Sequence, residues 1–310
     1  MSSQSLSNVS AVLQYEDFLE RVITFTLCTV PACVFLFVNG VMLFILRSKP
    51  VFHDSCRYIL LYNLLLADTV HLVVSQILFL LGVCRIILTY PVCGTITTFA
   101  SLITVISPLT LVVMSLERYV AVCFPLRHAS IITIRNTRVA VIGLWAFGSF
   151  HNLTRVVLML DFPFEKLESL QMKGLCYDFA MLVGSKSNDY DKSFTSFLFV
   201  SSGVVIVSSY IGVIIAARSA STDKASVLKA RNTLLLHLVQ LCFSLSSTIY
   251  SPVLVSLKKI LAGIIFMRLH IFLYIVIILF PRCLSSLIYG LRDQTIRPVL
   301  LHHLCCRQKV

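Results

Sequence analysis

Seven long apolar runs constrain this chain more than any other feature of its sequence. They lie at about residues 22–46, 58–83, 95–116, 139–158, 194–217, 232–257 and 269–291. Each is long enough for the helix of roughly 20 residues that crosses a bilayer, and none has the short alternating pattern of a barrel strand. Only 13% of the residues are charged, too few for a water-facing surface. The sequence therefore predicts an all-α membrane protein, a seven-transmembrane helix bundle with a short amphipathic helix after the seventh span.

The loop charges predict how this bundle lies in the plasma membrane. With the N-terminus outside, the inner segments hold more than half of the 26 Lys and Arg residues but only four of the 14 acids, namely Asp54, Glu117, Asp223 and Asp293. By the positive-inside rule, we expect residues 1–21 to be an extracellular tail, residues 22–291 the seven-span membrane domain, and residues 292–310 a cytoplasmic amphipathic helix and tail. The tail 1–21 lacks the features of a signal peptide. The net charge of +12 then matches anionic membrane lipid and requires no nucleic acid.

Eleven cysteines are present, but their spacing fits no metal site, and we expect neither a metal nor a cofactor. Cys93 and Cys176 both fall on the oxidising outer side, where a disulfide would tether the long loop before the fifth span to the bundle. Two alternatives remain open: both thiols are free, or Cys84 is the partner. At the surface, Asn8 in "NVS" is a predicted glycan acceptor, and Cys305 and Cys306 are predicted palmitoylation sites.

Two ionisable residues lie at membrane depth, where an ionised side chain costs at least about 2.5 kcal/mol. Asp68 is near the middle of the second span, and Arg282 is within the seventh. If both face the interior, each neutralises the other, so we predict an Asp68–Arg282 pair. The alternative is that Arg282 extends to the headgroups while water, Ser107 and Ser285 solvate Asp68.

Glu117 and Arg118 are adjacent at the inner end of the third span, followed by Tyr119. The carboxylate is the nearest partner for the guanidinium, and Tyr210 or Tyr289 could accept it in a second arrangement of the helices. Such a two-state contact is what a signalling switch requires. The alternative is that the pair only anchors the helix end.

Several segments together resemble one family. "MSLERYVAVCFPLRH" (residues 114–128) resembles the inner end of the third helix in rhodopsin-like G-protein-coupled receptors, and its second half is similar to the odorant-receptor branch. Further matches are Asn39 in "VNGVML", Asp68 in "LLLAD", Trp145, "KARNTLLLHL" before the sixth span, and "SLIYGLRDQTIRPVL" at the end of the seventh. The resemblance covers nearly the whole chain. From their positions within the spans we expect Asn39, Asp68, Ser107, Arg282 and Ser285 to form an intramembrane polar cluster.

The chain also departs from that family at informative positions. Ser285 and Ser286 stand where the family has Asn-Pro, so the usual kink is missing, although Pro281 offers one earlier. Arg282 lies beside the place where many members bind sodium, which predicts weak or absent sodium sensitivity. Ser107 replaces a glutamate that is common in mammalian odorant receptors. These differences indicate a divergent, fish-type odorant receptor.

The resemblance implies a function: a small-molecule odorant binds within the outer half of the bundle, and the inner half admits a heterotrimeric G protein of the olfactory stimulatory type, which raises cyclic AMP. Ala100 stands where amine receptors carry an acid, so a neutral or weakly polar ligand is favoured. Dimerisation stays open.

The alternatives to this function are a non-olfactory rhodopsin-like receptor for another small molecule or a peptide and, more remotely, a transporter or channel, although no inverted repeat or ring of pore charges is visible. No catalytic constellation points to an enzyme. The predicted pocket wall consists of Ser101, Thr104, Phe197, Phe199, Thr248 and Tyr250.

Overall fold

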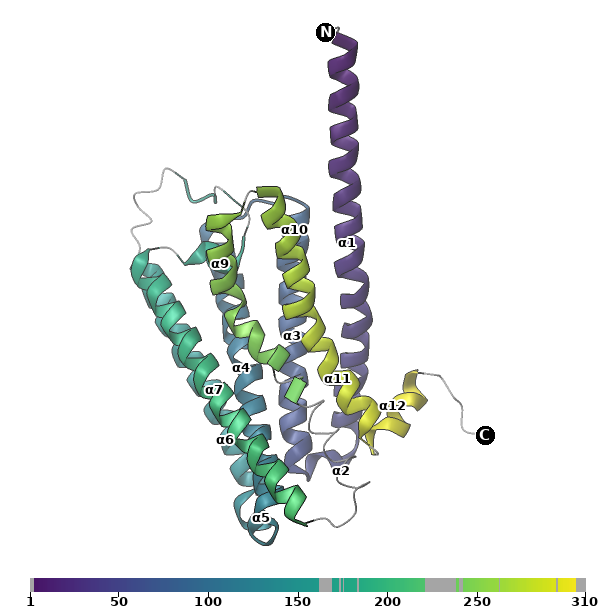
Figure 1. The fold of residues 1–310 in the computed structure, drawn as a ribbon, viewed down its shortest axis with the longest axis vertical. Coiled ribbons are helices and arrows are strands. Elements are labelled where there is room, and N and C mark those ends of the chain that lie inside the picture. Colours follow the sequence, from purple (N-terminus) through teal and green to yellow (C-terminus); the bar gives the residue numbers. More distant parts are fainter. Residues whose placement is uncertain are drawn as a thin grey trace.

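The computed structural model describes residues 3–161, 169–172, 174, 176–182, 184–220, 238–239, 242–261, 263–293 and 295–304. These residues are almost entirely helical, and their one β-bridge joins Thr89 to Gln171. The long helices run side by side as a bundle (Figure 1). Their bounds are α1 Ser3–Ser48, α2 Pro50–His53, α3 Cys56–Val83, α4 Tyr90–Cys123, α5 Pro125–Ile131, α6 Ile134–Leu160, α7 Ser185–Ala220, α9 Tyr250–Ile260, α10 Gly263–Leu273, α11 Phe280–Arg292 and α12 Ile296–Leu304.

The helices match the predicted spans in order. Five stretches of the described helices are long and apolar enough to cross a membrane: Leu19–Ser48, Cys56–Val83, Tyr90–Cys123, Ser185–Ala216 and Arg268–Gly290. The predicted fourth span corresponds to α6, and α9 lies in the predicted sixth. One boundary differs from the expectation, because α1 begins at Ser3 and is helical through the stretch expected to be a tail.

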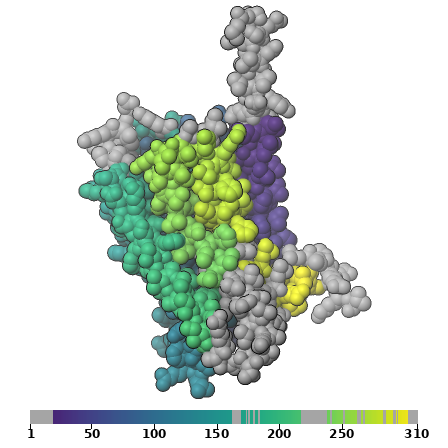
Figure 2. Space-filling model, in the orientation of Figure 1, coloured from purple at the N-terminus to yellow at the C-terminus, as the bar shows by residue number. Residues whose placement is uncertain are grey.

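The bundle is centred on α4, which packs against α3, α6 and α7. Polar side chains join three of these helices: Asn63 on α3 donates to Thr110 Oγ1 on α4 at 2.8 Å, and Trp145 on α6 donates to Asn63 Oδ1 at 2.9 Å. Close packing needs a small residue on α6, because a Cβ on Gly148 would meet Ile106 Cδ1 at 3.0 Å. On the face of the molecule that Figure 2 shows, α7, α9, α10 and α11 form one continuous surface.

The seventh span contains an irregular segment. Between α10 and α11, residues Tyr274–Leu279 form a π-helical turn, and Pro281 follows at the start of α11. Proline has no N–H to donate to the preceding turn, and a π-helical segment is a usual way to accommodate such a break. The irregular segment therefore directly precedes Pro281, ahead of the position where the family has its own proline.

Asp293 ends the seventh span and starts α12. Its Oδ1 accepts hydrogen bonds from the backbone N–H groups of Thr295 and Ile296 at 2.9 and 3.2 Å, as an N-cap residue does. Its Oδ2 lies 3.3 Å from Arg57 Nη2 at the start of α3. The carboxylate therefore fixes the angle between α11 and α12 and ties both to α3.

Candidate ligand cavity and switch residues

A cavity of about 500 Å³ lies among the described residues, within the usual range for small-molecule sites. Helices α1, α3, α4, α6, α7, α9, α10 and the π-helical turn contribute to its wall. Four of the six predicted wall residues line it: Ser101 and Thr104 from α4, Thr248 just before α9, and Tyr250 at the start of α9. By surface area the wall is mostly apolar, so it suits a ligand with a large hydrocarbon part.

The prediction for α7 is corrected by the structure. Phe197 and Phe199 do not line the cavity, whose α7 residues are Asp191, Phe194, Thr195 and Leu198. These four follow the three- and four-residue spacing of a single helical face. Phe197 falls on another face and is 65% exposed, as expected for a lipid-facing side chain. Aromatic character alone could not separate the two faces.

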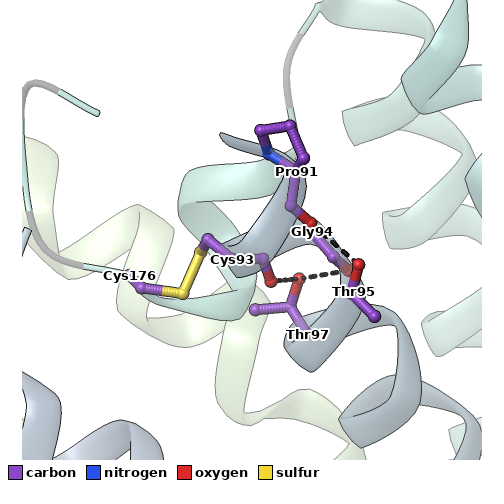
Figure 3. Close-up of a disulfide and its surroundings, with 6 residues drawn as sticks. All are labelled: Pro91, Cys93, Gly94, Thr95, Thr97 and Cys176. Carbon is purple, nitrogen blue, oxygen red and sulfur yellow. Dashed lines mark hydrogen bonds between the residues drawn. A yellow bond between two sulfur atoms is a disulfide. The ribbon is translucent and has the colours of Figure 1, made fainter. Parts of the chain in front are cut away.

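The predicted disulfide closes one end of the bundle. Cys93, one turn into α4, is bonded to Cys176 in the loop before α7 (Figure 3). Cys84, the rival partner, is an exposed free thiol. The same loop pairs with the chain before α4, since Tyr90 N donates to Leu170 O and Met172 N to Leu88 O. The loop is therefore held against the cavity from two sides.

An ionic cluster that joins this loop to two helices, with Asp191 buried and Asp178 a third exposed, was not anticipated. Arg155 on α6 donates to Asp178 Oδ1 at 3.0 Å, and its Nε lies 3.5 Å from Asp191 Oδ1 on α7. All three line the cavity. In the sequence these three residues are separate charges of the predicted outer segments, with no pattern that pairs them. A charged residue late in the fourth span was the signal that could have found the cluster.

Three histidines on the wall were also missed: His270, and the two more deeply buried ones, His71 and His151. His151 stacks on Phe194 with ring centroids 3.5 Å apart, and its Nδ1 lies 3.1 Å from Tyr190 Oη. His71 on α3 is 95% buried, one turn beyond Asp68. A lone histidine in an apolar run is weak evidence by itself, and only the fold brings these three to a common cavity.

The structure brings Asp68 and Arg282 together beyond the deep end of the cavity. Arg282 Nη1 lies 3.3 Å from Asp68 Oδ1, and both side chains are fully buried. Ser107 donates to the same carboxylate oxygen at 2.7 Å, and Arg282 Nη2 donates to Ser247 Oγ at 2.9 Å. Ser285, also buried, donates to Pro281 O.

Asn39, the fifth residue of the expected polar cluster, makes no direct hydrogen bond to it. Its side chain is fully buried, and neither amide atom has a hydrogen-bond partner among the described residues.

The proposed switch residues lie at the far end of α4. Arg118 Nε is 3.4 Å from Glu117 Oε2, and His128 Nε2 is 3.9 Å from Glu117 Oε1. Thr104 and Arg118 are 14 residues apart on one helix, so the ion pair lies about 21 Å along α4 from the cavity wall.

The tyrosines expected near this ion pair are packed close to it. Tyr210 and Tyr289 belong to one buried cluster with Met114, one turn before Arg118. Tyr119 packs on α7, since a Cβ on Gly212 would approach its ring within 2.5 Å. Three predicted modification sites, Asn8, Cys305 and Cys306, lie outside the residues whose side chains the structure describes.

A helical membrane bundle with a disulfide-covered cavity at one end and an ion pair at the other has the parts of a transmembrane receptor. The chain belongs to the 7 transmembrane receptor (rhodopsin family), whose sequence model matches residues 38–289. This confirms the seven-helix bundle, and the family is one of receptors rather than enzymes.

Two named relatives cover most of the chain. The chain is 30% identical over 274 residues to Odorant receptor 131-2 of Danio rerio, covering 88% of this chain and 83% of that protein. It is 27% identical over 218 residues to Olfactory receptor 4K15 of Homo sapiens, covering 65% and 60%.

Proposed function

We propose that the chain is an odorant receptor of the plasma membrane that binds a small molecule in the cavity and activates a heterotrimeric G protein. The observation that carries the proposal is the position of the cavity, whose wall includes residues of α4, the helix that carries Glu117 and Arg118 at its other end. The names of the relatives, odorant and olfactory receptors, support an odorant as the ligand.

The proposed orientation places the disulfide end of the bundle outside the cell and Arg118 in contact with the cytoplasm. The excess of Lys and Arg in the segments at the Arg118 end supports it. In a sensory neuron this membrane is that of the cilia. Asn8 is then available to the glycosylation machinery, and Cys305 and Cys306 to palmitoylation.

Coupling follows from a shift between two arrangements of the Arg118 end. In the resting arrangement Arg118 is held by Glu117, 3.4 Å away. Ligand in the cavity favours an arrangement in which Arg118 leaves Glu117 for Tyr210 or Tyr289, and the opened end admits the G protein. The partner is the olfactory stimulatory type, so activation raises cyclic AMP.

The test is a cyclic AMP reporter in cells that co-express the receptor with the olfactory stimulatory G protein, exposed to an odorant panel. At least one odorant should raise cyclic AMP with the wild type and none with Arg118→Ala at matched surface expression. An epitope tag at the N-terminus should be accessible on intact cells, and one at the C-terminus only after permeabilisation. Cyclic AMP that stays flat with every odorant at full surface expression would refute the proposal.

A further inference from the structure

The polar groups on the cavity wall are not equally available to a ligand. Four wall hydroxyls donate their proton to a carbonyl of their own helix segment: Ser75 to Leu72, Thr104 to Ala100, Ser247 to Ser244 and Thr248 to Leu245, at 2.6 to 3.1 Å. With their protons committed, these oxygens can only accept a further hydrogen bond. This part of the wall is therefore a set of acceptors.

Two wall residues have buried polar atoms without any partner among the described residues, His71 Nδ1 and Tyr250 Oη. His71 is 95% buried. An unpartnered buried polar atom costs about 1 to 3 kcal/mol, so a ligand that satisfies it recovers part of that cost.

Both residues belong to the wall of the same cavity. His71 is one turn of α3 beyond Asp68, so it lies just above the buried Asp68–Arg282 pair. Tyr250 lies further toward the disulfide loop, since its ring is 6.2 Å from that of His270, which contacts the ring of Tyr177 at 5.4 Å.

Charged side chains on the wall already have partners. Arg155 is paired with Asp178 and Asp191, and Glu20 with Arg268. Arg21 and Arg85 also have interactions of their own. An ionic ligand would have to break one of these pairs, whereas an uncharged ligand would not.

We propose that the cavity selects uncharged ligands that carry a hydroxyl on a compact hydrocarbon body, with the hydroxyl bound by the unpartnered atoms that His71 and Tyr250 contribute to the wall. A hydroxyl can accept one hydrogen bond and donate another. It can therefore bond to His71 Nδ1 or Tyr250 Oη and also donate to one of the wall hydroxyl oxygens that can only accept. An ether or ketone only accepts, and an ammonium group only donates. This assignment rests on the proposed function and adds the ligand class to it.

The test compares sets of odorants that share a carbon skeleton and differ in one group: the alcohol, its methyl ether, the corresponding ketone or aldehyde, the amine and the carboxylic acid. Several linear and cyclic skeletons of eight to ten carbons are used in the cyclic AMP assay. On responding skeletons the alcohol should be about tenfold more potent than its methyl ether, the equivalent of about 1.4 kcal/mol. An amine or acid that is the most potent member, or an ether equal to its alcohol, overturns the proposal.

Variants locate the effect. Tyr250→Phe and His71→Phe should each bring the potency of the alcohol close to that of its methyl ether. His71→Asn, whose amide can replace Nδ1, should keep the alcohol more potent than the ether. Tyr274→Phe is the matched control, because this wall hydroxyl already donates to Gln76 Oε1 at 3.3 Å, and the alcohol-over-ether potency ratio should remain. An unchanged ratio in both Tyr250→Phe and His71→Phe overturns the assignment of these residues.

Failure of this proposal can be told apart from failure of the proposed function. If no skeleton gives a response but Glu117→Gln raises basal cyclic AMP, the receptor couples and the ligand class is wrong. If neither any skeleton nor any odorant of the wider panel changes cyclic AMP at full surface expression, the proposed function itself is wrong.

Discussion

Arg282 Nη1 and Asp68 Oδ1 lie 3.3 Å apart in the interior of the bundle, with no exposed surface on either side chain. Ser107 adds a hydrogen bond to the carboxylate, and Ser247 accepts one from the guanidinium. A buried pair of this kind balances a large desolvation cost against its attraction, so the loss of one partner is far more harmful than the loss of both.

Removing one charge should therefore reduce folding, and removing both should restore part of it. We expect Asp68→Asn and Arg282→Gln each to reduce the free energy of unfolding by about 3 to 5 kcal/mol and to lower surface expression strongly. The double variant should be more stable and better expressed than either single variant. Flow cytometry of an N-terminal tag and thermal unfolding in detergent measure this. Glu20→Gln, which breaks the exposed pair with Arg268, is the control and should have little effect. Purely additive losses would argue against direct contact.

Signalling should not depend on sodium, because Arg282 supplies a fixed cation beside Asp68. Replacing external and internal sodium by N-methyl-D-glucamine should leave the odorant dose–response curve unchanged. The measurement is membrane-based nucleotide exchange on the G protein, where both sides of the membrane are controlled. A rightward or leftward shift of several-fold with sodium would contradict the idea of a built-in cation.

The disulfide closes a loop between residues 83 positions apart in the sequence, and a closed loop of this length stabilises by about 4 kcal/mol in the chain-entropy treatment. Cys93→Ser and Cys176→Ser should each abolish most surface expression and odorant response, and the double variant should be no worse than either. Cys84→Ser removes an exposed free thiol and should behave as wild type. A strong loss in Cys84→Ser would mean that the pairing is different in the cell.

Arg155 neutralises two acids, so its loss should be worse than the loss of either acid. Arg155→Met leaves Asp178 and Asp191 without their guanidinium, 3.0 and 3.5 Å away in the structure, and should destabilise by about 3 kcal/mol or more. Asp178→Asn should be milder, because that carboxylate is a third exposed. Thermal unfolding of the purified variants ranks them, and combining Arg155→Met with Asp191→Asn should recover stability. A double variant no more stable than Arg155→Met would show that the cluster does not hold the loop.

The features predictable from the sequence were those fixed by local chemistry. Apolar length gives the spans, and the cost of a charge in lipid makes Asp68 and Arg282 natural partners wherever the helices bring them. The side of the membrane on which each residue falls made Cys93–Cys176 the expected pair, but it left Cys84 open as a rival partner until the structure showed the bond. None of these inferences needed the rotation of a helix about its own axis.

The features that were missed depend on that rotation and on loop placement. Phe197 and Leu198 are adjacent in the sequence, but only Leu198 faces the cavity, and in α7 apolar residues occupy both the inner and the lipid-facing sides. Asp178 meets Arg155 because the disulfide places the loop over α6, which no local pattern encodes. His71 acquires its significance only from a cavity formed by several helices.

The contact between Glu117 and Arg118 gives the last prediction, a rise in basal signalling when it is weakened. Glu117→Gln keeps the shape of the side chain and removes the charge that holds Arg118 Nε at 3.4 Å. A lost contact of about 1 kcal/mol would raise the active population roughly fivefold, so basal cyclic AMP should rise by a similar factor while the response to odorant is preserved. Asp161→Asn, which breaks the exposed pair with Lys186, is the control and should leave basal cyclic AMP unchanged. Basal cyclic AMP at the wild-type level in a well-expressed Glu117→Gln receptor would mean that this ion pair anchors the helix end and does not restrain the resting state.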